Sequence, residues 1–229
     1  MHCLFEQSGT FKNEFRKLGY EAYDYDIQNE FGETDYVIDL FEEIRKGYDG
    51  KPSIFDTFGE NDYVFAFFPC TRFSSKIPVW LRGEAPQQVN WSDEKKLQYS
   101  MNMQEELSEL YQLICKMAYI AFEKGIKMII ENPYDHAHYL TMYWCLKPML
   151  VDKDRTKNGD YFKKPTQYYF LNCCPKNNLV FEPLDWVQQK WVKHQKNENG
   201  VKRQVMRSMI HPQYANRFIR KYLIDDPTT

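Results

Sequence analysis

The sequence predicts an α/β protein with a mostly parallel sheet and helices on both faces of that sheet. Residues 2–26 read as strand, small-residue loop, helix and strand, the βαβ arrangement of Rossmann-like folds. Residues 63–67 form an apolar run of the length of a buried strand. A helix pattern then leads from Ser92 to Gly125 and into a second apolar run, residues 126–130. Because this crossover contains a helix, the two strands should be parallel neighbours.

Length and composition favour a single domain. With 229 residues, 43% of them hydrophobic, the chain can bury a sizeable core. The six cysteines form no C-x-x-C pair, and Cys173 and Cys174 with His194 lack the spacing of a zinc site, so we expect no metal. The start has no signal-peptide pattern, and no apolar run reaches membrane-spanning length. We therefore expect a cytoplasmic protein with reduced thiols and no membrane partner.

The N-terminal segments place polar groups where a nucleoside cofactor would meet them. We expect a strand over residues 2–5, a loop over 6–10, a helix over 11–18 and a strand that ends at Asp26. A further strand ends at Asp39. Backbone N–H groups of such a loop receive the polar part of a nucleoside, and acids at the strand ends accept bonds from its ribose and base. The alternative for both aspartates is helix capping.

Cys70 lies just beyond the strand at residues 63–67, which must end at Pro69 because proline cannot donate to a sheet ladder. In open α/β sheets, ligands bind at this edge, and a thiolate there can act as a nucleophile. The alternative is that a lone cysteine is simply a small core residue. The strand at residues 126–130 delivers residues 131–133 to the same edge. A carboxyl, an amide and a thiol should therefore converge on one crevice.

The remaining elements follow from periodicity and turn residues. Residues 76–90 contain two prolines and predict a loop or lid. We expect helices over residues 139–146 and 212–223, strands over 149–151 and 167–171, and a basic loop over 155–166. The long helix should bury a stripe made up of Leu97, Met101, Leu107, Leu110, Tyr111, Ile114, Met117, Ala118 and Ala121.

Charge is unevenly distributed, although the net charge is only −2. Between residues 190 and 221 the single acid Glu198 faces nine basic residues: Lys190, Lys193, Lys196, Lys202, Arg203, Arg207, Arg217, Arg220 and Lys221. This run predicts either a basic face for phosphates or a solvated helix, and charge alone does not decide between them.

The motifs of the chain resemble those of a known family. Residues 68–74 read Phe-Pro-Cys-Thr-Arg-Phe-Ser and residues 131–133 read Glu-Asn-Pro. They resemble the nucleophile loop and the Glu-Asn-Val/Pro motif of the cytosine-C5 methyltransferases, most closely of the small bacteriophage and prophage members. Residues 5–10 resemble the cofactor motif of that family, residues 159–166 its glycine…Lys-Pro-Thr stretch, and residues 207–212 its closing helix. The motifs keep the family's order over most of the chain.

The resemblance implies a Rossmann-like, S-adenosylmethionine-dependent methyltransferase fold and a covalent mechanism. The Cys70 thiolate would add to C6 of cytosine, which makes C5 enamine-like. Glu131 would hold the N3 and amino edge and supply a proton there, with Asn132 orienting Glu131 and the loop. C5 would then take the methyl group of S-adenosylmethionine, after which a base removes the C5 proton. A cytosine in duplex DNA must be flipped out to reach such a pocket.

Carried over residue by residue, the resemblance gives three sets of site residues. The catalytic set is Cys70, Glu131 and Asn132. The cofactor set is Phe5, Ser8, Gly9, Thr10, Asp26, Asp39 and Pro69. The DNA set is Arg72, Ser74, Arg155, Lys164, Lys202, Arg203 and Arg207, in which Arg155 stands in for an absent Gln-x-Arg-x-Arg stretch. A small recognition region is expected at about residues 173–206 of the single domain at residues 1–229.

The chain departs from the family pattern at two positions, and other functions remain open. Phe68 replaces the first proline of the nucleophile loop, and Gln7 replaces the first glycine of the cofactor motif. One alternative is the same chemistry on RNA or on a free cytosine nucleotide. Another is a catalytically silent nucleic-acid-binding relative, which would not need Cys70 and Glu131 together. An unrelated nucleotide-binding α/β protein would explain the strands but not the order of the motifs.

Overall fold

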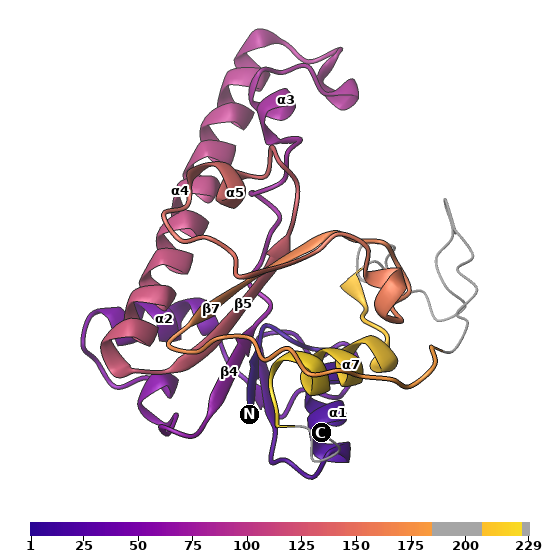
Figure 1. Ribbon diagram of the computed structural model, residues 1–229. Coiled ribbons are helices and arrows are strands. Elements are labelled where there is room, and N and C mark those ends of the chain that lie inside the picture. Colours follow the sequence, from indigo (N-terminus) through magenta and orange to yellow (C-terminus); the bar gives the residue numbers. More distant parts are fainter. Residues whose placement is uncertain (185–207, 226–229) are drawn as a thin grey trace.

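The computed structural model describes residues 1–184 and 208–225, which form a mixed α/β fold around one seven-stranded sheet (Figure 1). The sheet order is β3-β2-β1-β4-β5-β7-β6. The strands are β1 (His2–Leu4), β2 (Tyr23–Asp26), β3 (Tyr36–Val37), β4 (Tyr63–Ala66), β5 (Lys127–Pro133), β6 (Leu150–Asp152) and β7 (Thr166–Leu171). All pairings are parallel except those of β7, which is antiparallel to both β5 and β6. The predicted mostly parallel sheet, with β4 and β5 as parallel neighbours, is confirmed.

Helices cover both faces of this sheet. On one face, a hydrophobic cluster joins side chains of α2 (Leu40–Tyr48) and α4 (Asp93–Lys124) to the sheet. On the other face, a second hydrophobic cluster joins side chains of α1 (Thr10–Lys17) and α7 (Pro212–Tyr222) to it. Shorter helices are α3 (Ile77–Leu81), α5 (Tyr139–Tyr143) and the 3-10 turns η1 (Ile54–Asp56), η2 (Pro86–Gln88) and η3 (Arg155–Asn158). The first five strands follow the doubly wound order, in which the strand order reverses between β1 and β4.

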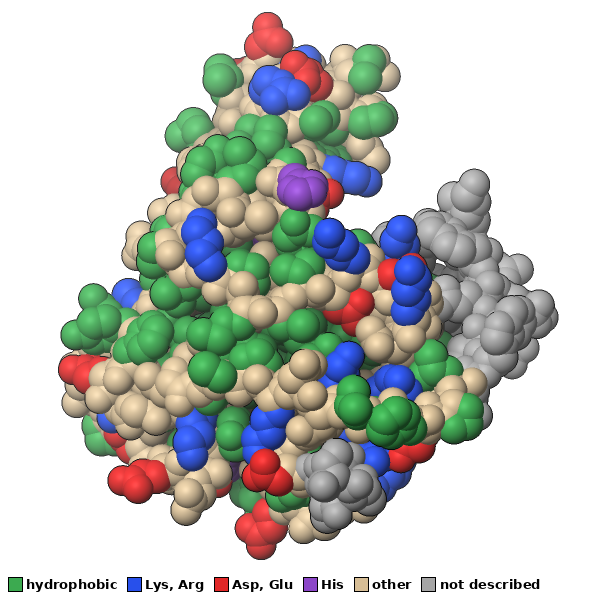
Figure 2. All heavy atoms as spheres, viewed as in Figure 1, with side chains coloured by type: hydrophobic (Ala, Val, Ile, Leu, Met, Phe, Trp, Pro, Cys, Tyr) green, Lys and Arg blue, Asp and Glu red, His purple; other side chains and the backbone are tan. Residues whose placement is uncertain are grey.

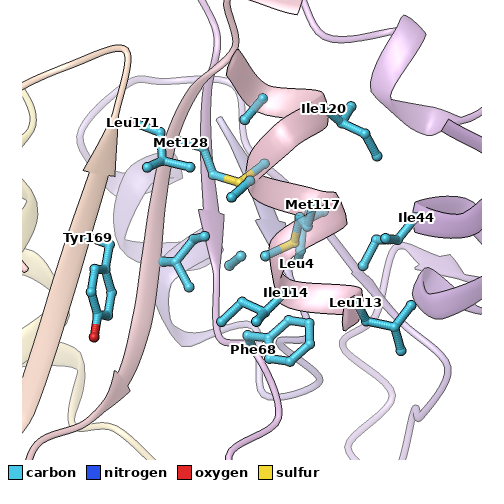
Figure 3. Close-up of a cluster of buried hydrophobic side chains, with 14 of the residues drawn as sticks. Leu4, Ile44, Phe68, Leu113, Ile114, Met117, Ile120, Met128, Tyr169 and Leu171 are labelled. Atoms are coloured by element: carbon cyan, nitrogen blue, oxygen red, sulfur yellow. The ribbon is translucent and has the colours of Figure 1, made fainter. Parts of the chain in front are cut away.

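The long helix α4 begins and ends where its sequence predicts. Ser92 Oγ accepts a hydrogen bond from the Lys95 amide, and Gly125 takes the left-handed conformation with φ of 67°. Its C-terminal half packs Ile114 and Met117 against the sheet residue Met128 (Figure 3). From position 107 the predicted stripe is buried or half-buried, with Leu107, Ile114, Met117, Ala118 and Ala121 in the core and Leu110 and Tyr111 at its border.

The first part of that stripe is an error of the sequence prediction. Leu97 and Met101 are 66% and 58% exposed. A helix of 32 residues is about 48 Å long, and its N-terminal half extends past the sheet into an arm that also holds α3 (Figure 1). Helical periodicity fixes which side of α4 faces the sheet, but it does not say where the sheet ends.

Four further predicted boundaries need correction. Residues 76–90 contain α3 and η2 rather than a structureless loop, and the Gln88 side chain donates to the Trp80 carbonyl at 3.1 Å. Strand β5 extends through Pro133, because residues 131–133 also pair with β7. The helix predicted over residues 139–146 is only α5, and α7 ends at Tyr222.

Candidate functional site

The loop after β4 holds Cys70 between two buried aromatic anchors. Phe68 is 2% exposed and lies in the core beside Ile114 of α4 (Figure 3). Its carbonyl accepts a hydrogen bond from Asn132 Nδ2 at 2.9 Å. On the other side of the thiol, Phe73 is buried and its amide donates to the Cys70 carbonyl at 3.0 Å. Cys70 itself is half-buried, in a loop that these two anchors fix on the sheet edge.

Residues 131 and 132 face opposite sides of the sheet because they are consecutive in β5. Asn132 pairs with Gln167 and supports the Cys70 loop, whereas Glu131 pairs with Tyr168 on the side covered by α7. The Glu131 side chain is buried, and its Oε1 atom has no hydrogen-bond partner among the described residues. The sequence placed residues 131–133 after the strand; the structure places them inside it, held there by the β7 ladder.

Two cations approach the unbonded oxygen of Glu131. Arg155 NH1 lies 3.7 Å from Oε1, and Lys164 Nζ lies 3.9 Å from it. Burial raises the pKa of the Cys70 thiol, the charge of Glu131 raises it further, and the charge of Lys164 lowers it. The pKa of the thiol therefore depends on the charge at position 131, since a neutral side chain there would remove one of the effects that oppose thiolate formation.

Arg155, predicted to stand in for the stretch that supports the flipped base, is buried beside Glu131 and does not reach the surface. It is 0% exposed, ion-pairs with Asp160 at 2.5 Å, and lies 4.5 Å from the centre of the Tyr214 ring. A basic residue in a turn-rich loop is usually solvated, but here a buried aspartate and an aromatic face receive the guanidinium. Of the two cations near Glu131, Lys164 is the one that solvent reaches, with a side chain that is 29% exposed.

The other predicted DNA contacts are mixed. Arg72 forms an ion pair with Glu106 of α4, and Ser74 Oγ accepts from the Lys76 amide at 3.3 Å, so both are engaged within the protein. Lys202, Arg203 and Arg207, like most of the expected recognition region, lie outside the described residues.

The predicted cofactor residues gather at the carboxyl ends of β1, β2 and β4. Phe5 follows β1 with φ of 60°, a left-handed conformation that is uncommon for a bulky residue, and Gly9 has φ of 63°. Ser8 Oγ and Thr10 Oγ1 lie 3.1 Å apart. Pro69 precedes Cys70 in the loop after β4. The loop at residues 5–10 is thus sharply turned although it has a single glycine.

The two predicted acids of the cofactor set differ in what they do. Asp39 is the N-cap of α2, and its Oδ1 accepts from the amides of Phe41 and Glu42. The capping alternative therefore describes Asp39. Asp26 ends β2, where burial raises its pKa, and its carboxylate accepts from the Gln28 amide at 2.8 Å and from the Ile27 amide. Unlike Asp39, Asp26 caps no described helix, which makes it the better candidate for a ligand.

Sequence reasoning missed two residues of this region. Glu6 is buried and caps α1 from outside the helix, with its two carboxylate oxygens accepting from the amides of Phe11 at 2.8 Å and Lys12 at 3.4 Å. Burial raises the pKa of Glu6 to about 7. Phe41 stands with Phe5 and Phe68 in a cluster of rings whose centres are 5.4 to 6.1 Å apart. Both residues flank predicted site positions in the sequence, which was the available signal.

The surface is hollowed between the α3–α4 arm and the η3 segment, and Lys and Arg side chains stand around this hollow (Figure 2). A separate hollow of about 380 Å³ between α2 and α4, lined by Arg45, Glu105 and Lys116 among others, contains none of the predicted site residues. Among the described residues, no helix has both the length and the apolar character needed to cross a membrane. Comparisons of the chain with family models, curated proteins and solved structures give no match.

Proposed function

We propose that this protein is an S-adenosylmethionine-dependent methyltransferase that acts at C5 of cytosine in DNA through a covalent bond to Cys70. One observation carries the proposal: a partly exposed thiol and a buried carboxylate with an unbonded oxygen lie at neighbouring strands of the edge where α/β sheets bind ligands. The strand order and the family resemblance of residues 68–74 and 131–133 support it.

The residues at the ends of β1 and β2 fit a cofactor that has no phosphate. In phosphate-binding Rossmann folds, the first helix presents free backbone N–H groups to the anion. Here the Glu6 carboxylate already accepts from the amides of Phe11 and Lys12, so a pyrophosphate would meet a buried acid. S-adenosylmethionine carries no phosphate, and its positive sulfonium is compatible with nearby carboxylates. When bound, it would supply the methyl group.

Four residues would hold this cofactor. Asp26 would accept hydrogen bonds from the ribose hydroxyls, because it lies at the end of β2 and, unlike Asp39, caps no described helix. The partly buried rings of Phe5 and Phe41, which lie against the buried ring of Phe68, would offer an apolar surface for a purine. This assignment places the cofactor across the reversal point of the strand order, between β1 and β4.

Cys70 and Glu131 would share the work on the base. Attack of the Cys70 thiolate on C6 forms the S–C6 bond and moves electron density toward N3. A proton held on Glu131 and delivered to N3 prevents negative charge from accumulating there. Burial and then the charge of Glu131 raise the pKa of Cys70, so the carboxyl group and the nucleophile interact electrostatically. After methylation, a base removes the C5 proton, which expels the Cys70 thiolate from C6, and return of the N3 proton to Glu131 restores the ring.

Arg155 and Asn132 would act through these two groups. Asn132 fixes the backbone of the Cys70 loop through the Phe68 carbonyl, and Arg155 holds a positive charge 3.7 Å from Glu131. Both are positioning residues in this proposal, since neither need touch the reacting atoms.

The experiment that tests the proposal is methyl transfer from labelled S-adenosylmethionine to three acceptors. Cytosine-containing duplex DNA, RNA of the same sequence and dCMP should be offered in parallel, with label identified as 5-methylcytosine after digestion. We expect label in the DNA arm. Label in only the RNA or dCMP arm would assign the same chemistry to another substrate. No label in any arm, with S-adenosylmethionine bound or not, would contradict the proposed activity.

A further inference from the structure

The segment between β6 and β7 carries lysines that no acidic side chain of residues 1–184 or 208–225 neutralises. Lys153, Lys157 and Lys163 are exposed, and none of them makes an ion pair within the part of the chain that the structure describes. Figure 2 shows Lys and Arg side chains on this lobe, beside the hollow that separates it from the α3–α4 arm. An isolated surface lysine is ordinary, but three in one short segment form a local excess of positive charge.

The acids of the same segment are used internally. Asp152 accepts from Asn158 Nδ2 at 2.9 Å and from the Tyr214 hydroxyl at 3.3 Å. Asp154 accepts from the hydroxyl of Thr156 at 2.6 Å as it caps η3. Asp160 accepts from the amides of Tyr161 and His211 and pairs with the buried Arg155. The negative charges are therefore directed inward, while the ammonium groups remain outside.

The backbone that presents these lysines is fixed. The Arg155 amide donates to the Lys163 carbonyl at 3.0 Å, and the Asp160 amide donates to the Arg155 carbonyl at 3.1 Å, which closes the segment on itself. The buried Arg155 side chain then pins the closed loop against Tyr214 of α7. A preordered set of cations loses less conformational freedom on binding than a flexible one.

The segment also adjoins the candidate site. Lys164, the residue after Lys163, places its Nζ atom 3.9 Å from Glu131 Oε1. The Pro165 carbonyl accepts from the Tyr134 amide at 2.8 Å, which ties this segment to the end of β5. A nucleic-acid strand with one base at Cys70 and Glu131 would therefore have its flanking backbone within reach of these lysines.

We infer that Lys153, Lys157 and Lys163 form a phosphate-binding surface, the β6–β7 surface, for the DNA strand that carries the target base. The choice of DNA as ligand rests on the proposed function, while the affinity for a polyanion rests on the charges and geometry above. Each lysine that neutralises a phosphate releases condensed counterions, so binding through this surface must weaken with added salt. Arg155 is excluded from the surface, because its guanidinium is buried.

The test compares salt dependence in three proteins. The first is the wild type, the second is K153Q/K157Q/K163Q, and the third is the matched control K17Q/K51Q/K124Q. The control removes the same charge from exposed lysines at the opposite edge of the sheet, where each pairs with an exposed or local acid. Affinity for a fluorescent cytosine-containing duplex is measured by anisotropy between about 50 and 200 mM salt, and folding is checked by thermal unfolding.

We expect the slope of log affinity against log salt to flatten by about 2 to 3 in K153Q/K157Q/K163Q and to stay at the wild-type value in the control. Equal slopes in all three proteins, equal flattening in both variants, or binding of RNA without binding of duplex DNA would each overturn the β6–β7 surface. Methyl transfer is measured separately. If the slope flattens in K153Q/K157Q/K163Q but none of the proteins transfers methyl groups, the β6–β7 surface is supported and the proposed function is refuted. If the proteins transfer methyl groups but have equal slopes, the proposed function is supported and the β6–β7 surface is refuted.

Discussion

The two sides of the sheet edge differ in how completely their polar groups are satisfied. On the nucleoside side, formed by residues 5–10, Asp26 and Asp39, the carboxylates of Glu6 and Asp39 each accept two backbone hydrogen bonds. On the thiol side, formed by Cys70, Glu131, Asn132, Arg155 and Lys164, Glu131 Oε1 and Asn132 Oδ1 are buried and lack hydrogen-bond partners among the described residues.

This difference indicates where a ligand would gain most. Buried polar atoms are nearly always bonded in proteins, and one left without a partner costs about 1–3 kcal/mol. The nucleoside side is closed by its own side chains and should bind by shape and a few added bonds. The thiol side should recover part of that cost when a polar base enters. Substitutions on each side in turn should therefore show which side gains more from a bound ligand.

The largest effect is expected from Cys70→Ala. This change removes the only thiol at the edge between β4 and β5 in the described part of the chain, so methyl transfer should fall by at least about three orders of magnitude. Cofactor binding and folding should be retained, because Phe68 and Phe73 anchor the loop without the sulfur. DNA containing 5-fluorocytosine should trap the wild type as an adduct that peptide mass spectrometry maps to Cys70. An adduct on another residue would refute the assignment of the nucleophile.

Glu131→Gln should lower methyl transfer by about 10²- to 10⁴-fold, since an amide keeps the shape of the side chain but cannot supply a proton. It also gives a readout that does not need substrate. The Glu131 charge raises the pKa of Cys70, so the variant should shift the pH profile of Cys70 alkylation to lower pH. Iodoacetamide rates across pH measure this, with Glu109→Gln, a surface acid of α4, as the control. Superimposable profiles would show that Glu131 does not act on the thiol.

Glu6→Gln tests whether the nucleoside side is closed by a carboxylate under strain from burial. The pKa of Glu6 is about 7 in the fold and near 4.5 when unfolded. Between those values the folded state holds more protons, so wild-type stability should fall by about 3 kcal/mol as pH rises from about 4.5 to 7. The glutamine keeps an acceptor for the Phe11 amide and removes this titration.

Thermal unfolding of wild type and Glu6→Gln at pH 5 and pH 8 measures the effect. The Tm of Glu6→Gln minus the Tm of the wild type should be larger at pH 8 than at pH 5. For the control Glu30→Gln, which changes an exposed acid, this difference should be the same at both pH values. A constant difference between wild type and Glu6→Gln would mean that Glu6 titrates in the fold as it does in water.

The sequence predicted the features that depend on local patterns and on general sheet geometry. Apolar runs located β4 and β5, Ser92 and Gly125 bounded α4, and the rule for helical crossovers brought Cys70 and residue 131 to one edge. The approach of the Cys70 loop to residues 131 and 132 was thus predictable, whereas the placement of Glu131 and Asn132 on opposite sides of the sheet was not.

What the sequence missed depends on partners distant in the chain. Glu131 lies within β5 because β7 pairs with it, and Arg155 is buried because Asp160 and Tyr214 receive its charge. Leu97 is exposed because the N-terminal half of α4 extends past the sheet and has no strand to pack against. In each case local pattern and propensity were outweighed by tertiary contacts that no window of sequence contains.

The smallest expected effects come from the two acids of the nucleoside side, and they should fall on different properties. Asp26→Ala removes a charged acceptor at the end of β2, so affinity for S-adenosylmethionine should drop about tenfold to a hundredfold, the value of 1.5–3 kcal/mol for a bond to a charged group. Asp39→Ala removes the cap of α2, which should cost about 1 kcal/mol of stability and less than tenfold in affinity. Calorimetric titration and thermal unfolding of both variants give the two values side by side. If Asp39→Ala instead loses affinity as strongly as Asp26→Ala while its Tm is unchanged, the carboxylate of Asp39 serves the ligand and not the helix. The nucleoside side would then, like the thiol side, have a polar group whose hydrogen bonds are completed only by a ligand.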